Sequence, residues 1–308
     1  MIVYHFLKDI DVSDDCAVSI GTFDGIHLGH TAVLRVMIEK AEELGLKTFV
    51  YTFKNNPAAY FSGKNPLIMD ENEKISVLES LGVDYVALLP FDEEQVSMTA
   101  ESFVEDVLCK KMHARFVSVG HDFRFGQGAS STADDLRRYG VRFGFEVHVM
   151  SPVLHRGKRI SSTDIRELLI RGDMQEVREL LGRDYFVEDT VSSGSAIGRR
   201  MGIPTINFVG HPELALKKGV YFTISDIGGK SYRSVTNVGM KPTVTDRNEL
   251  VIETHLLEFD EELYGEKVKV RFLKWHRDEK KFDSIVALSN QIAEDIKTAK
   301  EFFNKITE

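Results

Sequence analysis

The segment GTFDGIHLGH occupies residues 21–30 and decides how the first half of this chain is interpreted. The β-rich run before it, residues 16–21, predicts a strand, and the pattern after it predicts a helix over residues 28–44. A helix that begins directly after a strand offers free N–H groups and a positive dipole end, which together favour an anion.

Two histidines and two glycines make this turn suitable for a phosphate. His27 and His30 are three residues apart, so both can face one side of the first helical turn and stabilise charge during nucleotidyl transfer. Gly25 and Gly29 let the backbone approach a ligand closely. The alternative is an ordinary strand–helix turn that carries surface histidines.

Outward from this turn, β-rich runs alternate with helical patterns. The runs predict strands at residues 48–53, 85–89, 116–120 and 146–150, separated by helices over 71–81, 100–111 and 132–139. This alternation predicts βαβ units and a doubly wound parallel α/β sheet, whose ligands lie beyond the carboxyl ends of the strands.

The second half has a different rhythm. Strands are expected at residues 219–227, 231–238, 251–260 and 267–275, joined by short turns, which predicts an antiparallel β-barrel or sandwich. Apolar residues on one helical face of 283–303 predict a terminal helix packed on it. Residues 162–181 predict two short helices punctuated by Gly172, and we place the domain boundary between residues 182 and 183.

Composition excludes several classes of protein. The 308 residues contain 39 basic and 48 acidic side chains, a net charge of −9, which argues against nucleic-acid and anionic-membrane partners. No apolar run approaches the length of a membrane span, and acidic residues come too early for a secretory signal. Cys16 and Cys109 are isolated, so neither a disulfide framework nor a zinc site is expected. We expect a cytoplasmic protein and leave its oligomeric state open.

A second candidate nucleotide segment is ISSTDIR, residues 160–166. Ser162 or Thr163 can cap the helix that follows. Lys158, Arg159 and Arg166 would make a locally basic pocket suited to triphosphate oxygens. The alternative is a capped surface helix with a solvated run of charges.

The third segment, GSAIGRRMGIPTIN at residues 194–207, is not a Walker A loop but supplies glycines and cations. In an extended chain Thr205 and Asn207 point the same way, so their oxygens could hold Mg²⁺ together with substrate phosphates. A loop leading into a buried strand is the alternative. Further on, Glu253 lies inside an apolar strand, where it is either turned to solvent or placed as a general base.

Together these segments resemble the bacterial bifunctional riboflavin kinase/FMN adenylyltransferase (FAD synthetase) family, from Ile20 to the last helix. In the first half, GTFDGIHLGH, FVEDVL (103–108), VGHDFRFG (119–126) and ISSTDIR resemble the nucleotidyltransferase domain. In the second, GRRMGIPTIN, NVGMKPT (237–243), ETHLLEFDEELYG (253–265) and RDEKKFD (277–283) resemble the kinase barrel. The chain departs from the family pattern at two places. Residues 53–57 (FKNNP) lack a usual Pro and a usual His, and residues 127–132 (QGASST) lack a usual cation.

The resemblance implies a nucleotidyltransferase-type parallel sheet followed by a β-barrel with a terminal helix, as well as roles for individual residues. Catalysis is implied for Glu253, as the base for the riboflavin hydroxyl, and for His27 and His30. For adenylyl transfer, the implied ATP-binding residues are Gly21, Phe23, Asp24, Gly25, His27, His30, Ser161, Ser162, Thr163 and Arg166. Flavin binding is implied for Asp122, Phe123 and Asn237. The implied ATP-binding residues of the kinase are Gly198, Arg199, Gly202, Pro204, Thr205 and Asn207. Thr205 and Asn207 are also implied to hold Mg²⁺.

The implied chemistry has two steps. The ATP γ-phosphoryl passes to the ribityl hydroxyl of riboflavin and gives FMN; the FMN phosphate then attacks a second ATP at its α-phosphate, giving FAD and pyrophosphate. Such reactions depend mainly on positioning and charge neutralisation. Two alternatives stay open, namely riboflavin kinase activity alone and a catalytically inactive flavin- or nucleotide-binding regulator.

Overall fold

The computed structural model describes residues 1–63, 66–191, 205–211, 214–242, 248–259 and 263–307. The chain divides into two compact units, Met1–Ser162 and Thr163–Glu308. Among the described residues, no helix combines the length and the apolar character needed to cross a membrane.

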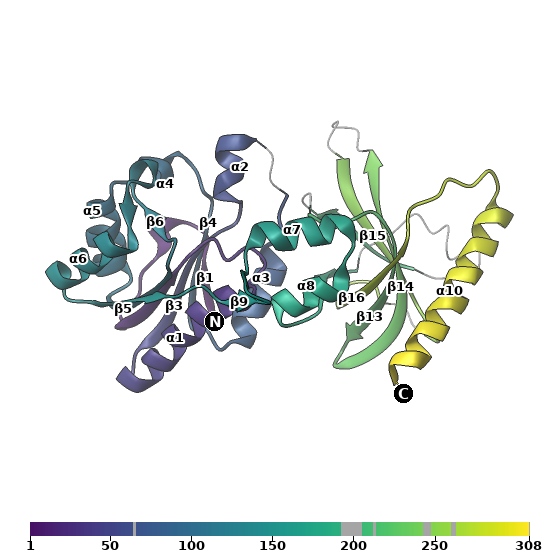
Figure 1. Ribbon diagram of the computed structural model, residues 1–308, viewed down its shortest axis with the longest axis horizontal. Helices are drawn as coiled ribbons and strands as arrows, with labels where there is room; N and C mark the ends of the chain where they lie inside the picture. The colour runs from purple at the N-terminus through teal and green to yellow at the C-terminus, as the bar shows by residue number, and fades with distance from the viewer. Residues whose placement is uncertain (64–65, 192–204, 212–213, 243–247, 260–262, 308) are drawn as a thin grey trace. The chain divides into compact units, whose positions relative to one another are not determined.

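The first unit is built on a six-stranded parallel sheet (Figure 1), which confirms the predicted α/β class. Its strands are, in spatial order, β1 (Ile2–Tyr4), β4 (Tyr85–Leu89), β3 (Lys47–Phe53), β2 (Cys16–Ile20), β5 (Ala114–Gly120) and β8 (Glu146–Met150). All five residues of β2 are buried, as expected for a central strand covered on both faces. The three-residue strand β1 is absent from the sequence-based prediction because it is too short to show a period.

Helices connect these strands. They are α1 (Leu28–Leu44), α2 (Pro57–Ser62), α3 (Glu71–Ser80), α4 (Glu93–Ser97), α5 (Ala100–Ser102), a π-helix (Phe103–Lys111) and α6 (Ala133–Phe143). Two short hairpins, β6 (Arg124–Phe125) with β7 (Ser131–Thr132) and β9 (Leu154–His155) with β10 (Lys158–Arg159), complete the unit. Helix α1 has the predicted bounds and ends at Gly45, whose φ of 66° is the left-handed conformation typical of a C-cap.

The second unit is a six-stranded antiparallel half-barrel with a terminal helix, again the predicted class. Its sheet order is β11 (Tyr185–Thr190), β16 (Lys267–Arg277), β13 (Gly219–Ile227), β14 (Lys230–Pro242), β15 (Asn248–Leu256) and β12 (Ile206–His211). Helices α7 (Ser162–Arg171) and α8 (Met174–Leu181) precede it. Figure 1 shows α10 (Ile285–Thr307) beside strand β14, where Ala299 and Phe303 pack against Phe222 and Val235.

The compact units separate between Ser162 and Thr163, which groups α7 and α8 with the half-barrel. The boundary expected from sequence, between residues 182 and 183, groups both helices with the first half. That boundary remains a prediction about where the two functions divide.

Hydroxyl groups form a buried ladder inside the half-barrel. Thr236 links two of its members, because its Oγ1 lies 2.7 Å from the Thr223 Oγ1 and 2.9 Å from the Thr254 Oγ1. Ser234 bridges Thr223 and Ser225 at 2.8 and 2.9 Å, and all five side chains are fully buried. Cross-strand hydroxyl pairs of this kind stabilise a sheet only while each group keeps a partner.

Thr236→Val should therefore lower the free energy of unfolding by about 1–3 kcal/mol, because a buried hydroxyl on a neighbouring strand loses its partner while side-chain shape is preserved. Urea unfolding monitored by circular dichroism measures the change. Thr190→Val, at an exposed position on β11, is the matched control and should shift it by less than about 0.5 kcal/mol. Equal effects of the two substitutions would contradict a stabilising ladder.

Candidate functional site

The predicted nucleotide residues of the first unit gather at one edge of the parallel sheet. Strands β2, β3, β4 and β5 run in the same direction, so the segments that follow them lie at their common carboxyl edge. Residues 21–30 follow β2, and Asp122 and Phe123 follow β5. This edge is where a doubly wound sheet binds ligands.

The loop between β2 and α1 has an unusual backbone. Gly25 has a φ of 86°, and two residues with side chains, Phe23 and Ile26, have φ values of 43° and 38°. A β-branched residue at positive φ is a conformational outlier, which persists only where the surroundings hold it. A Cβ on Gly25 would lie 2.9 Å from the Ile68 Cγ2, so this position also needs glycine for space.

The two predicted histidines stack on each other at the start of α1. Their ring centroids are 3.7 Å apart with planes 14° apart, and Phe23 meets His30 edge-on at 5.3 Å. The backbone N–H of His30 donates to the ring Nδ1 of His27 at 3.2 Å. Because Nδ1 accepts this bond, a neutral His27 carries its proton on Nε2 and can donate it to an anion. Gly29 leaves room for this ring, since a Cβ there would lie 2.9 Å from the His27 Cε1.

Ser162, the last residue of the first unit, connects the second predicted segment to this loop. The Ser162 hydroxyl donates to the Asp24 carbonyl oxygen at 2.9 Å, across a separation of 138 residues. The Asp24 carboxylate, 3% exposed, accepts the Ile68 N–H at 3.0 Å. Ser161 is half-buried beside Ser162, while Thr163, exposed, and Arg166, buried, belong to the second unit.

The predicted flavin residue Asp122 contacts Arg159, one of the three cations of the predicted basic pocket. The Asp122 Oδ2 accepts a hydrogen bond from the Arg159 Nη1 at 3.0 Å, and this guanidinium also lies 3.3 Å from the His121 Nε2. Phe123 stacks on Phe125 with centroids 5.5 Å apart. Arg159 therefore reaches the end of β5, where it supplies positive charge although residues 127–132 carry none.

The asparagines that replace the family's usual residues after β3 have structural contacts of their own. The Asn55 side chain donates to the Phe91 carbonyl at 3.1 Å and accepts the Phe91 N–H at 2.7 Å. Asn56 caps α2 by accepting the Ala58 N–H at 2.9 Å. Asn55 thus ties the loop after β3 to the loop after β4.

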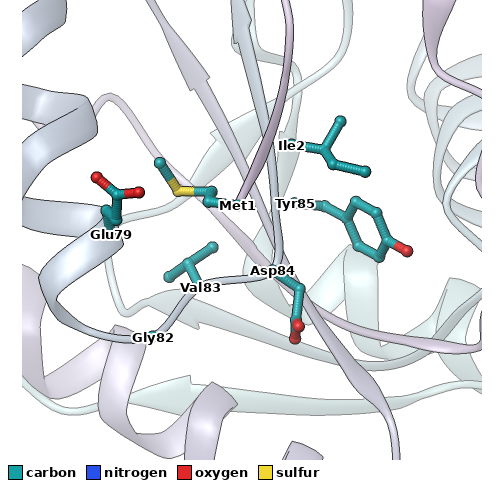
Figure 2. A pocket seen from close by; sticks show the side chains of 7 residues that line it. All are labelled: Met1, Ile2, Glu79, Gly82, Val83, Asp84 and Tyr85. Atoms are coloured by element: carbon teal, nitrogen blue, oxygen red, sulfur yellow. The ribbon is translucent and has the colours of Figure 1, made fainter.

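A cavity of about 410 Å³ in the first unit lies elsewhere. Figure 2 shows its lining, which includes Met1, Ile2, Asp84 and Tyr85, at the amino ends of β1 and β4. None of the predicted site residues lines it. The opposite, carboxyl edge of the sheet therefore remains the candidate nucleotide site of this unit.

Lys74 of α3 also reaches that edge and was not predicted from the sequence. Its ammonium donates to the Thr22 carbonyl at 3.0 Å, the Phe53 carbonyl at 2.6 Å and the Thr52 hydroxyl at 3.4 Å. Burial lowers the pKa of Lys74 to about 8, against the opposing effects of Asp24 and Glu71. A lysine in a charged helical segment gives no sequence signal of such burial.

In the second unit, three predicted residues stand side by side on neighbouring strands. Glu253 of β15 is directly opposite Asn207 of β12 on one side and opposite Asn237 of β14 on the other. Directly opposed residues of an antiparallel pair share one face of the sheet, with Cβ atoms about 5 Å apart. The predicted general base, metal-binding amide and flavin-binding amide are therefore in one row.

The row is partly protected from water. Asn207 is 6% exposed, Glu253 is half-buried, and the buried Ile252 and Thr254 turn to the opposite face. The Asn207 amide also donates to the Thr205 carbonyl at 3.4 Å, which places another oxygen beside it. Four predicted ATP-binding residues lie outside the described residues: Gly198, Arg199, Gly202 and Pro204.

All three side chains of this row carry oxygen atoms. Elsewhere too, the described part of the chain has no group of three or more His, Cys, Asp or Glu residues placed to hold a metal ion. A cation bound there would depend on hydroxyl, amide and substrate oxygens. Those are the ligands of a hard cation that keeps part of its water shell.

Known protein families match both parts of the chain. A family model described as FAD synthetase matches residues 9–164, and one described as riboflavin kinase matches residues 181–303. A bifunctional riboflavin kinase/FMN adenylyltransferase from Haemophilus influenzae is 39% identical over 95% of this chain and 96% of its own length. The protein of the same name from Escherichia coli strain K12 is 35% identical over 94% and 93%.

One solved structure covers almost the whole chain. It is described as a macrolide-efflux protein from Streptococcus pneumoniae and has a TM-score of 0.81 and 32% identity over 97% of this chain and 99% of that one. Its description names efflux, whereas both family models and the curated relatives name flavin nucleotide synthesis. The chain belongs to the bifunctional riboflavin kinase/FMN adenylyltransferase family, and it is an enzyme with both activities.

Proposed function

We propose that Glu253 is the general base of riboflavin phosphorylation, with Asn237 as a flavin contact and Asn207 as a contact to ATP. The single observation that carries this proposal is the row Asn207–Glu253–Asn237 on three adjacent strands. The carboxylate would accept the proton of the ribityl hydroxyl while that oxygen attacks the γ-phosphorus of ATP. ADP then leaves as FMN forms.

Magnesium would be held by Thr205 and Asn207. Both side chains carry an oxygen atom that can bind a metal ion. Asn207 is buried, and its amide nitrogen lies 3.4 Å from the Thr205 carbonyl oxygen. Such a group of oxygens suits a hard cation. When bound, the ion would neutralise phosphate charge. The chain's own residues orient the nucleotide and keep the carboxylate of Glu253 beside the hydroxyl; Gly198, Arg199, Gly202 and Pro204 complete the proposed ATP contacts.

For adenylyl transfer, the ATP phosphates would lie against the loop formed by Gly21, Phe23, Asp24 and Gly25, at the start of α1. The Nε2–H of His27, the ring of His30 and the positive dipole end of α1 would stabilise charge as the FMN phosphate attacks the α-phosphorus and pyrophosphate leaves. Ser161, Ser162, Thr163 and Arg166 are proposed further ATP contacts, supported by the hydrogen bond of Ser162 to the loop. Asp122 and Phe123 are proposed flavin contacts at the same sheet edge.

Each activity would then belong to one part of the chain, adenylyl transfer to residues 1–182 and riboflavin phosphorylation to residues 183–308. The FAD synthetase model ends at residue 164 and the riboflavin kinase model begins at residue 181, which supports this division. We also propose a cytoplasmic setting, which the ATP requirement and the two free cysteines support.

Incubation of the protein with riboflavin, ATP and Mg²⁺, followed by chromatography of the flavins, tests the proposal. FAD is the expected product, and FMN should appear before it. Accumulation of FMN without FAD would restrict the activity to the kinase. Unchanged riboflavin would contradict both site assignments.

A further inference from the structure

Lys74 is a buried lysine that has no role in the proposed chemistry. Its side chain is 4% exposed, and its three ammonium donors have three oxygen partners at 2.6 to 3.4 Å. The Thr22 carbonyl belongs to the loop after β2, whereas Thr52 and Phe53 end β3. One side chain thus joins the carboxyl ends of two neighbouring strands.

The loop that Lys74 contacts needs such support. Its two non-glycine residues at positive φ, Phe23 and Ile26, are in conformations that cost of order 1–3 kcal/mol each unless neighbours enforce them. Ser162 holds the loop at the Asp24 carbonyl, and Ile68 holds it at the Asp24 carboxylate. At Thr22, the first residue after Gly21, the carbonyl accepts hydrogen bonds from the Lys74 ammonium and from the Thr52 hydroxyl, each at 3.0 Å, and Lys74 also contacts that hydroxyl.

We propose that Lys74 is a positioning residue for adenylyl transfer, which fixes the Thr22 carbonyl and thereby the loop conformation that presents His27 and His30 to the ATP phosphates. This inference rests on the proposed assignment of residues 21–30 to the ATP site. Lys74 itself need not touch the nucleotide, because it acts through the backbone of Thr22.

The charge of Lys74 makes this role sensitive to pH. Its pKa is lowered to about 8 by burial, whereas the carboxylates of Asp24 and Glu71 oppose that shift. An ammonium donates to all three oxygens, but a neutral amine has only two N–H donors for them. Raising the pH through 8 should therefore loosen the anchor.

Other charged groups surround the anchor. Lys54, just after β3, pairs with Glu71 at 3.1 Å, and Glu73 accepts the Asp70 N–H at 2.6 Å within the capping box of α3. These contacts hold the neighbouring carboxylates in place.

Loosening of the loop can be separated from unfolding. The pKa of Lys74 in the folded chain lies below its unfolded value of 10.5. Deprotonation between pH 8 and 10.5 therefore removes a burial penalty, and this group makes the fold more stable as the pH rises. Loosening of the loop over this range therefore means that the neutral amine stays buried and gives up one hydrogen bond, because exposure of Lys74 to water becomes less favourable as the pH rises.

The first test is amide hydrogen exchange of residues 22–27 in Lys74→Met, with Lys47→Met as matched control. Lys47 lies at the other end of β3, pairs with Asp84 at 3.1 Å and has a side chain that is 51% exposed. Exchange of the loop should accelerate by about 10-fold or more in Lys74→Met only. Unchanged loop exchange, or loss of protection throughout the first unit, would overturn the positioning role.

The second test is the pH profile of kcat/KM for ATP in FAD formation from FMN. The wild-type profile should fall above about pH 8, while Lys74→Met should be about 10-fold slower at pH 7 and lack that fall. Riboflavin phosphorylation by the same preparations is the internal control and should be unchanged. An identical alkaline limb in the variant would overturn the proposal.

Wild-type loop exchange, corrected for its intrinsic pH dependence, supplies a readout that needs no variant and should rise through pH 8. A loop protected equally at pH 7 and 9.5 would overturn the role even if Lys74→Met failed to fold. Absence of FAD formation by the wild type would overturn the ATP-site assignment together with this inference. FAD formation with unchanged loop exchange in Lys74→Met would overturn this inference alone.

Discussion

Glu253→Gln is expected to lower kcat for riboflavin phosphorylation by about 10³-fold, because the amide keeps the shape of the side chain but cannot accept the hydroxyl proton. KM for ATP should change little, since Asn207 and Thr205 remain in place. Initial rates of FMN formation from riboflavin measure the effect.

The control for this substitution is Glu266→Gln, an exposed carboxylate in the same unit that should leave both rates unchanged. FMN supplied directly to Glu253→Gln should still be converted to FAD at the wild-type rate. Near-normal phosphorylation by the folded variant would contradict the assignment of the base.

His30→Ala is expected to slow conversion of FMN to FAD by about 10²- to 10³-fold, the usual effect of losing a group that stabilises transition-state charge. The substitution also removes the ring that stacks on His27. Assays with FMN and ATP measure this step alone, and riboflavin phosphorylation in the same preparation should be unaffected.

Thermal unfolding of His30→Ala separates a chemical effect from a structural one. His148→Ala, at an exposed position on β8 of the same unit, is the matched control. FAD formation at wild-type rate by His30→Ala would remove this ring from the catalytic site. Loss of kinase activity as well would contradict separate sites.

The fold was predictable where local signals agree with packing. Helix α1 has the predicted bounds because His27 caps its start and Gly45 ends it. Alternation of strands and helices predicted the parallel sheet, whereas β1 and β11 escaped prediction because a three-residue strand and an edge strand after a helix carry little periodicity. The partners of each strand depend on long-range packing, which no short window reveals.

The candidate sites were predictable in composition but not in arrangement. Alternation alone left Glu253 either turned to solvent or placed as a base, and only the register of β12, β14 and β15 reveals its alignment with Asn207 and Asn237. Likewise, the hydrogen bond between Ser162 and Asp24 spans 138 residues and has no local signature. Lys74 was not predicted because its burial depends on contacts with the ends of β2 and β3, which lie outside its own helix in the sequence.

The most direct test of two separate ATP-using sites in one chain is a mixing experiment with Glu253→Gln and His30→Ala, each supplied with riboflavin, ATP and Mg²⁺. Alone, the first should leave riboflavin unchanged and the second should stop at FMN. An equimolar mixture should produce FAD, because FMN released by one protein can enter the other. A mixture of the two folded variants that forms no FAD would contradict the account.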